Sequence, residues 1–425
     1  MRHECIILAE SPGALVEVCG ISVLERLLRQ LQRLGLTKAI VLCTTPDVVA
    51  QHLARPSPNR ARVALDIRLR SPDNWPKDTG RFLVVAGDRI LDSRLLKLLD
   101  EQNSAAALVD SAPPATLQPL IESEPETPRG RLCGAALLEP ASVQSRPGPF
   151  PEMLRDQIAA GQIETIDLAS RDWNLPSLRR TLRPYWCPAP APAQQKNAEY
   201  VLLDAAQKWA LDFPAMVHAP IENFLISHLC KTPITPNQLT VFTNVAAWSA
   251  TFLFATGHLG WGVLLALIVG VLDGLDGKQA RVKIETSKAG KLEHWFDALF
   301  ENSWWIALAY FLQSSGLLPN AFAYLALLIA AEIVAGLAKW SVLRFCGRTI
   351  DEIGDFNRVV RLVGGRRNIY VWLLAVGILF GAAAEAYKIV TWWGALTAAV
   401  QVPRAAFTVR AHRKMRPVGN FTPAT

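Results

Sequence analysis

The sequence predicts a chain of two parts, an N-terminal α/β domain followed by an α-helical transmembrane bundle of six spans. Two observations lead to this prediction. Hydrophobic residues make up 51% of the 425 residues, and their distribution changes along the chain. Residues 1–195 have the pattern of a soluble α/β protein, and residues 238–410 that of a membrane protein. Short apolar runs alternate with a helical pattern in the first part, whereas long apolar runs follow one another in the second.

The first domain is expected over residues 1–182. Apolar runs at residues 5–9, 39–43 and 82–86 predict buried strands, and residues 23–35 have the periodicity of an amphipathic helix. Strands that alternate with helices predict a parallel, Rossmann-like sheet covered by helices on both faces. In such sheets, ligands bind beyond the carboxyl ends of the strands.

Two segments connect this domain to the membrane part. Residues 183–196 contain four prolines and are expected to form an extended, semi-rigid linker. Residues 197–232 are expected to form one or two amphipathic helices, broken near Pro214 and lying on the cytoplasmic face of the membrane. Their apolar face is made by Leu202, Leu203, Ala206, Trp209 and Phe213. A core helix of the first domain is the alternative for this segment.

The membrane domain is expected over residues 233–425. Its predicted spans each have close to the roughly 20 residues that a bilayer requires. They cover residues 238–256, 259–280, 290–312, 320–343, 368–386 and 388–408. Lys and Arg gather in the loops 281–289 and 344–367 and in the tail after residue 408, and the opposite loops are nearly free of both. This asymmetry places the first domain and the active site on the cytoplasmic side of a multi-pass protein of a bacterial or archaeal cytoplasmic membrane.

Charge and cysteine content agree with this placement. The formal net charge of +7 lies largely in the membrane-side loops, where it favours anionic lipid, and no nucleic-acid partner is predicted. The seven cysteines show no paired spacing, which predicts reduced thiols in the cytoplasm.

Four acidic residues stand at the edges of the second and third predicted spans. Asp273 and Asp276 are three residues apart, and Glu293 and Asp297 are four apart, so each pair shares one helix face. A charged carboxylate at such a place costs free energy unless it faces a cavity, a metal ion or another polar group of the pair. Two pairs of carboxylates are suited to a hard divalent cation. Ordinary membrane-edge charges, paired with nearby Lys and Arg, are the alternative.

This stretch resembles the signature of the CDP-alcohol phosphotransferases, D-x2-D-G-x2-A-R-x8-G-x3-D-x3-D. The residues that match at the expected spacing are Asp273, Asp276, Gly277, Ala280, Arg281 and Gly290. The third and fourth acids stand one residue earlier than in the signature, at Glu293 and Asp297, and the third is Glu rather than Asp. The opening of the first span, from Thr235 to Thr240, is also similar to that of the family.

The resemblance implies a reaction and a site. The reaction is metal-dependent transfer of a substituted phosphate from a CDP-alcohol to an alcohol acceptor, with release of CMP, in phospholipid or polyol-phosphate biosynthesis. Mg²⁺ or Mn²⁺ would be held by Asp273, Asp276, Glu293 and Asp297, with Asp297 as the catalytic base. The CDP contacts would be Asn237, Thr240, Asp273, Gly277, Ala280 and Arg281. For Asn237 and Thr240, helix capping alone is the alternative. Family members are commonly homodimers in contact with membrane lipid, and the same is expected here.

A second group of charges precedes the fifth predicted span. Arg361, Arg366 and Arg367 surround a Gly-Gly pair and could grip a phosphate on the acceptor or on an anionic lipid. Anchoring of the cytoplasmic loop is the alternative.

The first domain resembles the sugar-phosphate nucleotidyltransferases at residues 6–10, 19–42, 85–88 and 166–172. This resemblance makes Asp88 and Asp167 a candidate metal site, and a turn residue and a helix cap are the alternative. The loop at residues 9–18 has one Gly, no Arg and no Lys, so little is present to hold a triphosphate. A degenerate, non-catalytic domain and a cytidylyltransferase with altered contacts both stay open.

The two resemblances together are those of bifunctional enzymes that make CDP-inositol and join it to inositol phosphate. A function of another class is a catalytically silent, membrane-anchored nucleotide-binding or scaffold protein. The two classes differ in one observable, because the silent protein releases no CMP with any acceptor.

Overall fold

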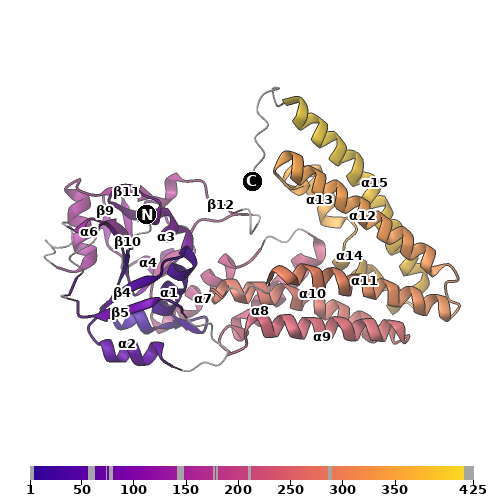
Figure 1. Ribbon diagram of the computed structural model, residues 1–425, viewed down its shortest axis with the longest axis horizontal. Helices are drawn as coiled ribbons and strands as arrows, with labels where there is room; N and C mark the ends of the chain where they lie inside the picture. The colour runs from indigo at the N-terminus through magenta and orange to yellow at the C-terminus, as the bar shows by residue number, and fades with distance from the viewer. Residues whose placement is uncertain are drawn as a thin grey trace. The chain divides into compact units, whose positions relative to one another are not determined.

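A computed structural model describes the backbone of residues 4–55, 63–72, 74–75, 80–140, 148–175, 178, 180–208, 212–285 and 290–415, and the side chains of the same residues except 290–298 and 414–415. The chain forms two compact units. The first comprises residues 1–209, 223–236 and 276–286, and the second comprises residues 210–222, 237–275 and 287–425. Helices α8 and α10 therefore contribute residues to both units (Figure 1).

The first unit is built on a mixed sheet in the order β11-β8-β10-β6-β1-β4-β5, with β9 paired to β10. The strands are β1 (Glu4–Ala9), β4 (Lys38–Cys43), β5 (Asp66–Arg70), β6 (Phe82–Ala86), β8 (Ala106–Asp110), β9 (Glu126–Thr127), β10 (Gly130–Leu138) and β11 (Glu164–Asp167). The three strands predicted from apolar runs are β1, β4 and β6. They are adjacent and parallel, with Ile7 paired to Val41 on one side and to Val85 on the other.

The prediction of a sheet that is parallel throughout is wrong for one strand. Strand β10 lies between β6 and β8 and is antiparallel to both. The physical reason is the connection that precedes it: β8 and β10 are separated by the short helix α4 (Gln118–Ile121) and the β9–β10 turn, which reverses the chain. A parallel return needs a longer crossover, usually a full helix.

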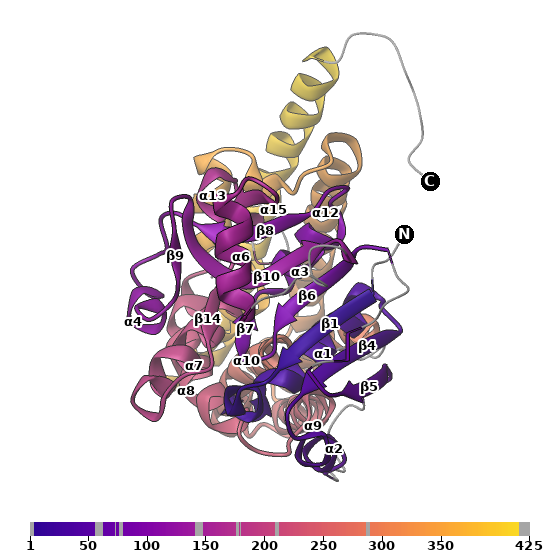
Figure 2. The same ribbon diagram turned by 90° about the vertical axis from the view of Figure 1, so that its left-hand side faces the viewer.

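Helices cover both faces of this sheet (Figure 2). Helix α6 (Phe150–Ala159) packs on one face through Phe150, Met153 and Leu154. Helices α1 (Val23–Leu34) and α3 (Ser93–Asp100) contact each other over the opposite face. The helix expected at residues 23–35 is α1; the Ser22 hydroxyl accepts a hydrogen bond from the Glu25 amide at its start, and Gly35 ends it in the left-handed conformation. A shorter helix, α2 (Pro46–Leu53), packs beside β5.

The proline-rich segment is extended as far as Ala191, continues into a 3-10 helix at Pro192–Gln194, and is part of the first unit. Its strand β14 (Trp186–Pro188) pairs with β7 (Arg89–Leu91). The Trp186 indole is fully buried and donates to Asp110 over 2.9 Å, and Arg183 pairs with the same carboxylate. Two short antiparallel ribbons are also present: β2 (Glu17–Val18) pairs with β3 (Ile21–Ser22), and β12 (Asn174–Leu175) pairs with β13 (Arg180–Thr181). Helix α7 (Gln195–Ala205) follows the proline-rich segment.

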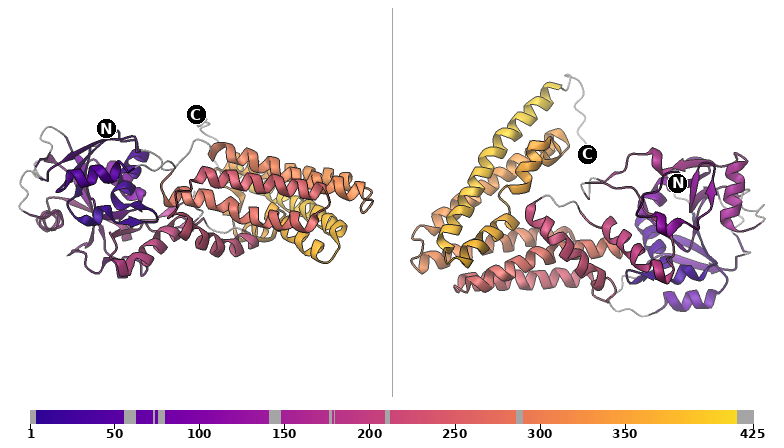
Figure 3. Two further views of the ribbon diagram at one scale, coloured as in Figure 1. Left: turned by 90° about the horizontal axis from the view of Figure 1, so that it is seen from below. Right: turned by 180° about the vertical axis from the view of Figure 1, so that it is seen from behind.

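The second unit is helical. Its helices are the first part of α8 (Phe213–Leu229), α9 (Pro236–Ala255), most of α10 (Leu259–Val282), α11 (Gly290–Ser314), α12 (Ala321–Cys346), α13 (Asp355–Val363), α14 (Arg367–Leu379) and α15 (Ala383–Met415). Figure 3 shows α12 and α15 running side by side, and α11 packs on α12. The core contains Phe254, Trp304 and Tyr387, and the Trp304 indole donates to the Ala247 carbonyl over 2.8 Å.

A helix stands at each of the six predicted spans, but not every helix is long and apolar enough to cross a bilayer. Within the described ranges, α10 and α12 could span by length and composition, and a third span results if α13 and α14, bent by 42°, are taken together. The fifth predicted span, 368–386, is too long, because Gly381 adopts a φ of +70° and ends α14. The Ala382 amide then donates to the Gly377 carbonyl over 2.7 Å, as in a Schellman cap.

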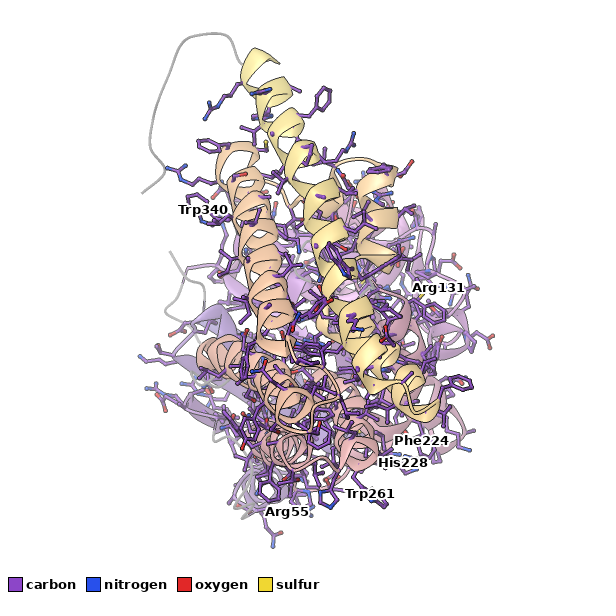
Figure 4. The ribbon with its side chains drawn as sticks, turned by 90° about the vertical axis from the view of Figure 1, so that its right-hand side faces the viewer. Arg55, Arg131, Phe224, His228, Trp261 and Trp340 are labelled. Carbon is purple, nitrogen blue, oxygen red and sulfur yellow. The ribbon has the colours of Figure 1, made fainter. Side chains whose placement is uncertain are left out.

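The outer surface of these helices is apolar. Trp261 on α10 and Trp340 on α12, both labelled in Figure 4, are 64% and 60% exposed. Many other large apolar side chains on α9, α11, α14 and α15 are exposed as well, and a surface with so many of them usually faces an apolar phase or a partner instead of water. The helical unit therefore has the surface of a membrane-associated domain.

Candidate functional site

The two acids of the motif that can be placed lie on one helix. Asp273 and Asp276 are one turn apart near the end of α10, with Asp273 half-buried and Asp276 4% exposed. The four-residue spacing of Glu293 and Asp297 falls in α11, but their side chains lie outside the described residues. The prediction that each acid pair shares a helix is thus confirmed for the backbone.

Arg367 binds the first acid of the motif. At the start of α14, its guanidinium pairs with the Asp273 carboxylate and, over 3.0 Å, with Glu301 on α11. The same group lies over the Phe300 ring, 5.4 Å from its centroid. Sequence reasoning missed Glu301, although it continues the four-residue spacing of Glu293 and Asp297. Arg367 thus holds α10, α11 and α14 together beside the motif.

A cavity of about 310 Å³ lies within the helical unit next to this ion pair. Three basic side chains, Lys339, Arg366 and Arg367, line it together with three acids, Asp212, Glu301 and Glu332. Lys339 and Arg366 have no ion-pair partner among the side chains that the structure describes. Lys339 was missed by the sequence analysis. A lysine inside an apolar span is itself a signal of function.

The predicted CDP contacts differ in their surroundings. Among the side chains that the structure describes, a Cβ on Gly277 would meet the Arg281 guanidinium alone, at 3.3 Å. The Arg281 Nε donates to the Ala206 carbonyl over 2.8 Å. Asn237 is exposed in the first turn of α9, and Thr240 is half-buried one turn later. Ala280 is half-buried and follows Gly277 by one turn of α10.

The first part of α8 lies against α10 where the motif begins. A Cβ on Gly270 would come within 2.9 Å of the His218 ring, and a Cβ on Gly274 within 2.6 Å of the Glu222 carboxylate. The two glycines are one turn apart and leave room for these side chains, as small residues do at close helix contacts. Glu222 therefore lies beside the residue that follows Asp273.

The three predicted arginines do not act together. Arg361 pairs with Asp351 over 2.8 Å and is absent from the cavity lining, whereas Arg366 and Arg367 line the cavity. Arg361 thus holds α13 to the turn before it. Only the second and third arginines are placed to meet a ligand in the cavity.

In the first unit, Asp88 and Asp167 have different partners. Asp167 accepts hydrogen bonds from the Ser111 hydroxyl, the Ser111 amide and the Ala169 amide, at 2.6, 3.1 and 3.0 Å. Burial raises the pKa of Asp167, but these hydrogen bonds and Arg183 outweigh it, and the net pKa is lowered. Asp88 lies 3.8 Å from Arg89, whose guanidinium also binds Glu124 over 2.7 Å.

Asp273 and Asp276 supply carboxylate oxygens, the ligands that Mg²⁺ and Mn²⁺ prefer. No group of three or more His, Cys, Asp or Glu suited to a metal ion is found among the side chains described. Asp273 and Asp276 are the two of the four predicted ligands whose side chains the structure describes, and their carboxylates suit such a cation.

Apolar helices, an acid pair near the end of α10 and a cavity lined by three basic and three acidic side chains describe a membrane-associated domain with a charged internal site. Residues 233–402 match the family model of the CDP-alcohol phosphatidyltransferases. The C-terminal part of the chain is accordingly a CDP-alcohol phosphatidyltransferase domain, a family that takes a CDP-alcohol donor and an alcohol acceptor.

Curated relatives extend this likeness. The chain is 25% identical over 417 residues to the bifunctional IPC transferase and DIPP synthase of Rubrobacter xylanophilus, with 88% of each chain covered. It is 27% identical over 200 residues to the phosphatidylinositol phosphate synthase of Mycobacteroides abscessus, which covers 42% of this chain and 87% of that protein. With the family match, these relatives show that the chain is a transferase.

The first unit is similar to solved nucleotidyltransferases. The inositol-1-phosphate CTP transferase from T. maritima aligns with 47% of this chain and 96% of its own, at 11% identity and a TM-score of 0.32. A putative glucose-1-phosphate thymidylyltransferase from Bacillus anthracis aligns at 12% identity and a TM-score of 0.33, over 47% of this chain and 94% of that one.

Proposed function

We propose that the chain is a six-span CDP-alcohol phosphotransferase that joins a substituted phosphate from a CDP-alcohol to an acceptor carrying both a hydroxyl group and a phosphate, with release of CMP. The observation that carries this proposal is the cavity beside Asp273. Lys339 and Arg366 line it, and neither has an ion-pair partner among the described side chains. Charge-assisted hydrogen bonds from such groups are the usual means of holding a phosphate.

The reaction is a substitution at phosphorus. The acceptor hydroxyl oxygen attacks the phosphorus that carries the donor alcohol, and the bond from this phosphorus to the oxygen bridging to CMP breaks. In the proposed site Asp297 takes the hydroxyl proton, and CMP leaves with the bond electrons. A cation held by Asp273, Asp276, Glu293 and Asp297 would neutralise the charge that develops on the leaving oxygen. Gly277 gives the donor nucleotide close access to α10.

Arg367 has a positioning role in this scheme. Because it pairs with Asp273 and lines the cavity, it links the acid that would hold the cation to the place where the acceptor phosphate would lie. A cation that binds Asp273 would compete with Arg367 for the carboxylate, and Glu301 keeps the guanidinium in place. The arrangement brings donor and acceptor together, which is the main contribution to phosphoryl transfer.

The experiment measures CMP release by the full chain in detergent with Mg²⁺ or Mn²⁺. CDP-diacylglycerol and CDP-inositol are each offered with polyols and their phosphates. We expect release that is lost in Asp276→Asn, and an acceptor KM that rises about tenfold or more in Lys339→Gln and Arg366→Gln for phosphorylated acceptors. Arg358→Gln is the matched control, since Arg358 pairs with the 94% exposed Asp355 and is absent from the cavity lining.

The outcomes separate the alternatives. If the enzyme releases CMP with unphosphorylated acceptors, and Lys339→Gln does not change this rate, the family activity stands. The proposal that the acceptor carries a phosphate is then refuted. No release with any pair of substrates, combined with retained CDP binding, would favour the catalytically silent nucleotide-binding protein.

A further inference from the structure

The end of the motif helix is held by the first unit. Residues 276–286, which include Asp276, Arg281 and the turn after α10, belong to the same compact unit as residues 1–209. Polar side chains fix this segment to two loops of that unit: Lys278 donates to the Gln207 side chain, Gln279 to the Ile234 carbonyl and Lys283 to the Thr232 carbonyl. The motif helix therefore ends inside a framework made by the first domain.

Two buried arginines on α1 make the longest-range of these contacts. Arg26 donates to the Val282 carbonyl over 2.7 Å, and Arg29 donates to the Lys283 carbonyl over 2.7 Å. These carbonyls lie where a helix has no intrahelical donors left. The guanidinium groups of Arg26 and Arg29, which are 1% and 4% exposed, supply the missing hydrogen-bond donors. Their positive charge also interacts favourably with the negative end of the helix dipole. Arg29 also pairs with Glu285 and with Glu25, at 3.0 and 2.7 Å.

The turn that they hold is strained. Ile284 adopts a φ of +55°, in the left-handed region that a β-branched residue rarely enters. The Glu285 amide donates to the Ala280 carbonyl over 2.8 Å, so the turn is a Schellman cap with Ile284 where glycine is usual. Such a conformation persists only when the surroundings impose it. Here the surroundings are Arg26, Arg29 and the pocket that buries the Ile284 side chain.

We infer that the first domain serves the transferase domain as a positioning device, with Arg26 and Arg29 as the positioning residues. They fix the axial position and rotation of the last turns of α10, and with them Asp276 and Arg281, which the proposed function places at the cation and the CDP group. This inference rests on that proposed function. It also gives the first domain a role that needs no nucleotidyltransferase activity, in agreement with the missing cations of the loop at residues 9–18.

The test uses the full chain in detergent and two readouts, the Kd for CDP in Mg²⁺ and the steady-state constants for CMP release. The variants are Arg26→Met, Arg29→Met and the conservative Arg29→Lys. We expect the Met variants to raise the Kd for CDP and the donor KM by about tenfold, because a misplacement of about 1 Å can cost roughly 100-fold and a smaller one costs less. The acceptor KM stays unchanged, since Lys339 and Arg366 lie in the other unit. Arg29→Lys restores part of the loss.

The matched control is Lys97→Met on α3, which removes a cation from the same domain. Lys97 and its partner Glu101 are 66% and 60% exposed, so this variant should leave the Kd for CDP and the donor KM unchanged.

A purely structural role would give a different result. Loss of folded protein lowers the number of active sites and the apparent kcat, but leaves the Kd for CDP and the donor KM as in the wild type. Wild-type Kd and KM values in both Met variants would overturn the inference, while the proposed function stands. A wild-type chain that neither binds CDP nor releases CMP would refute the proposed function and the inference with it.

Discussion

The Arg367 ion pairs allow a quantitative prediction for the site. The Arg367 side chain is 13% exposed, and the carboxylates of Asp273 and Glu301 are 24% and 35% exposed. A hydrogen bond to a charged group contributes about 1.5–3 kcal/mol when it is buried, and an exposed ion pair contributes about 0–1 kcal/mol. At this intermediate exposure we expect about 1 kcal/mol from each pair. The contact with the Phe300 ring adds about 0.5–1 kcal/mol, so that Arg367→Met should destabilise the helical unit by about 2–3 kcal/mol.

The measurement is thermal unfolding of the full chain in detergent. For a unit of this size, about 1 kcal/mol corresponds to a change in Tm of roughly 2–4 °C. Arg367→Lys should lose about half as much as Arg367→Met, because a lysine keeps the charge but cannot bridge two carboxylates. A double-mutant cycle of Arg367→Met with Glu301→Gln isolates one pair, for which we expect a coupling energy of about 1 kcal/mol.

Arg358→Met is the control for this series, since its partner Asp355 is 94% exposed and its loss should change the Tm very little. The reasoning is refuted if Arg367→Met lowers the Tm no more than this control does. A coupling energy of zero between Arg367 and Glu301 would show that the two side chains do not interact in solution.

Two further predictions concern the first unit. Asp110→Ala should destabilise it by about 3–5 kcal/mol, because this 1% exposed carboxylate is the partner of both Arg183 and the buried Trp186, and the lower Tm should be accompanied by altered Trp fluorescence. Asp167→Asn should cost about 1 kcal/mol at neutral pH through the weakened cap. The pKa of Asp167 is lower in the folded state than the ordinary value of 3.8, so its charged form stabilises the fold at any pH above 3.8. This stabilisation is lost as the pH falls through the lower pKa of the folded state. Urea unfolding curves of the two proteins should therefore converge at acid pH, and a difference that persists there would contradict the assignment.

Much of the fold could be predicted because its signals are local. The apolar runs of β1, β4 and β6 are continuous, since both faces of these strands are buried, and α1 has its cap residues Ser22 and Gly35 in sequence. Strand β10 is equally apolar, but its direction depends on a turn and on its neighbours. The end of α14 was missed for a related reason, since an apolar run continues beyond the glycine that ends the helix.

The site was predictable only in part. The acid pairs of α10 and α11 follow from spacing within single helices. Lys339 comes from α12 and Glu301 from a later turn of α11, and only packing brings them to Arg367 and the cavity. The helix-ending contacts of Arg26 and Arg29 join residues more than 250 positions apart. No local pattern distinguishes these arginines from the charged face of an ordinary surface helix.

The left-handed turn at Ile284 has a consequence for biogenesis. Domains fold in the order in which the ribosome delivers them, so that the sheet and α1 can be complete before α10 is synthesised. Arg26 and Arg29 are then already fixed when the Val282 and Lys283 carbonyls emerge. The nascent transferase domain thus meets a preformed template that is covalently attached and made first. A transferase domain expressed without the preceding domain must form the same turn against its own backbone preference, and we expect its membrane insertion to yield less correctly assembled protein.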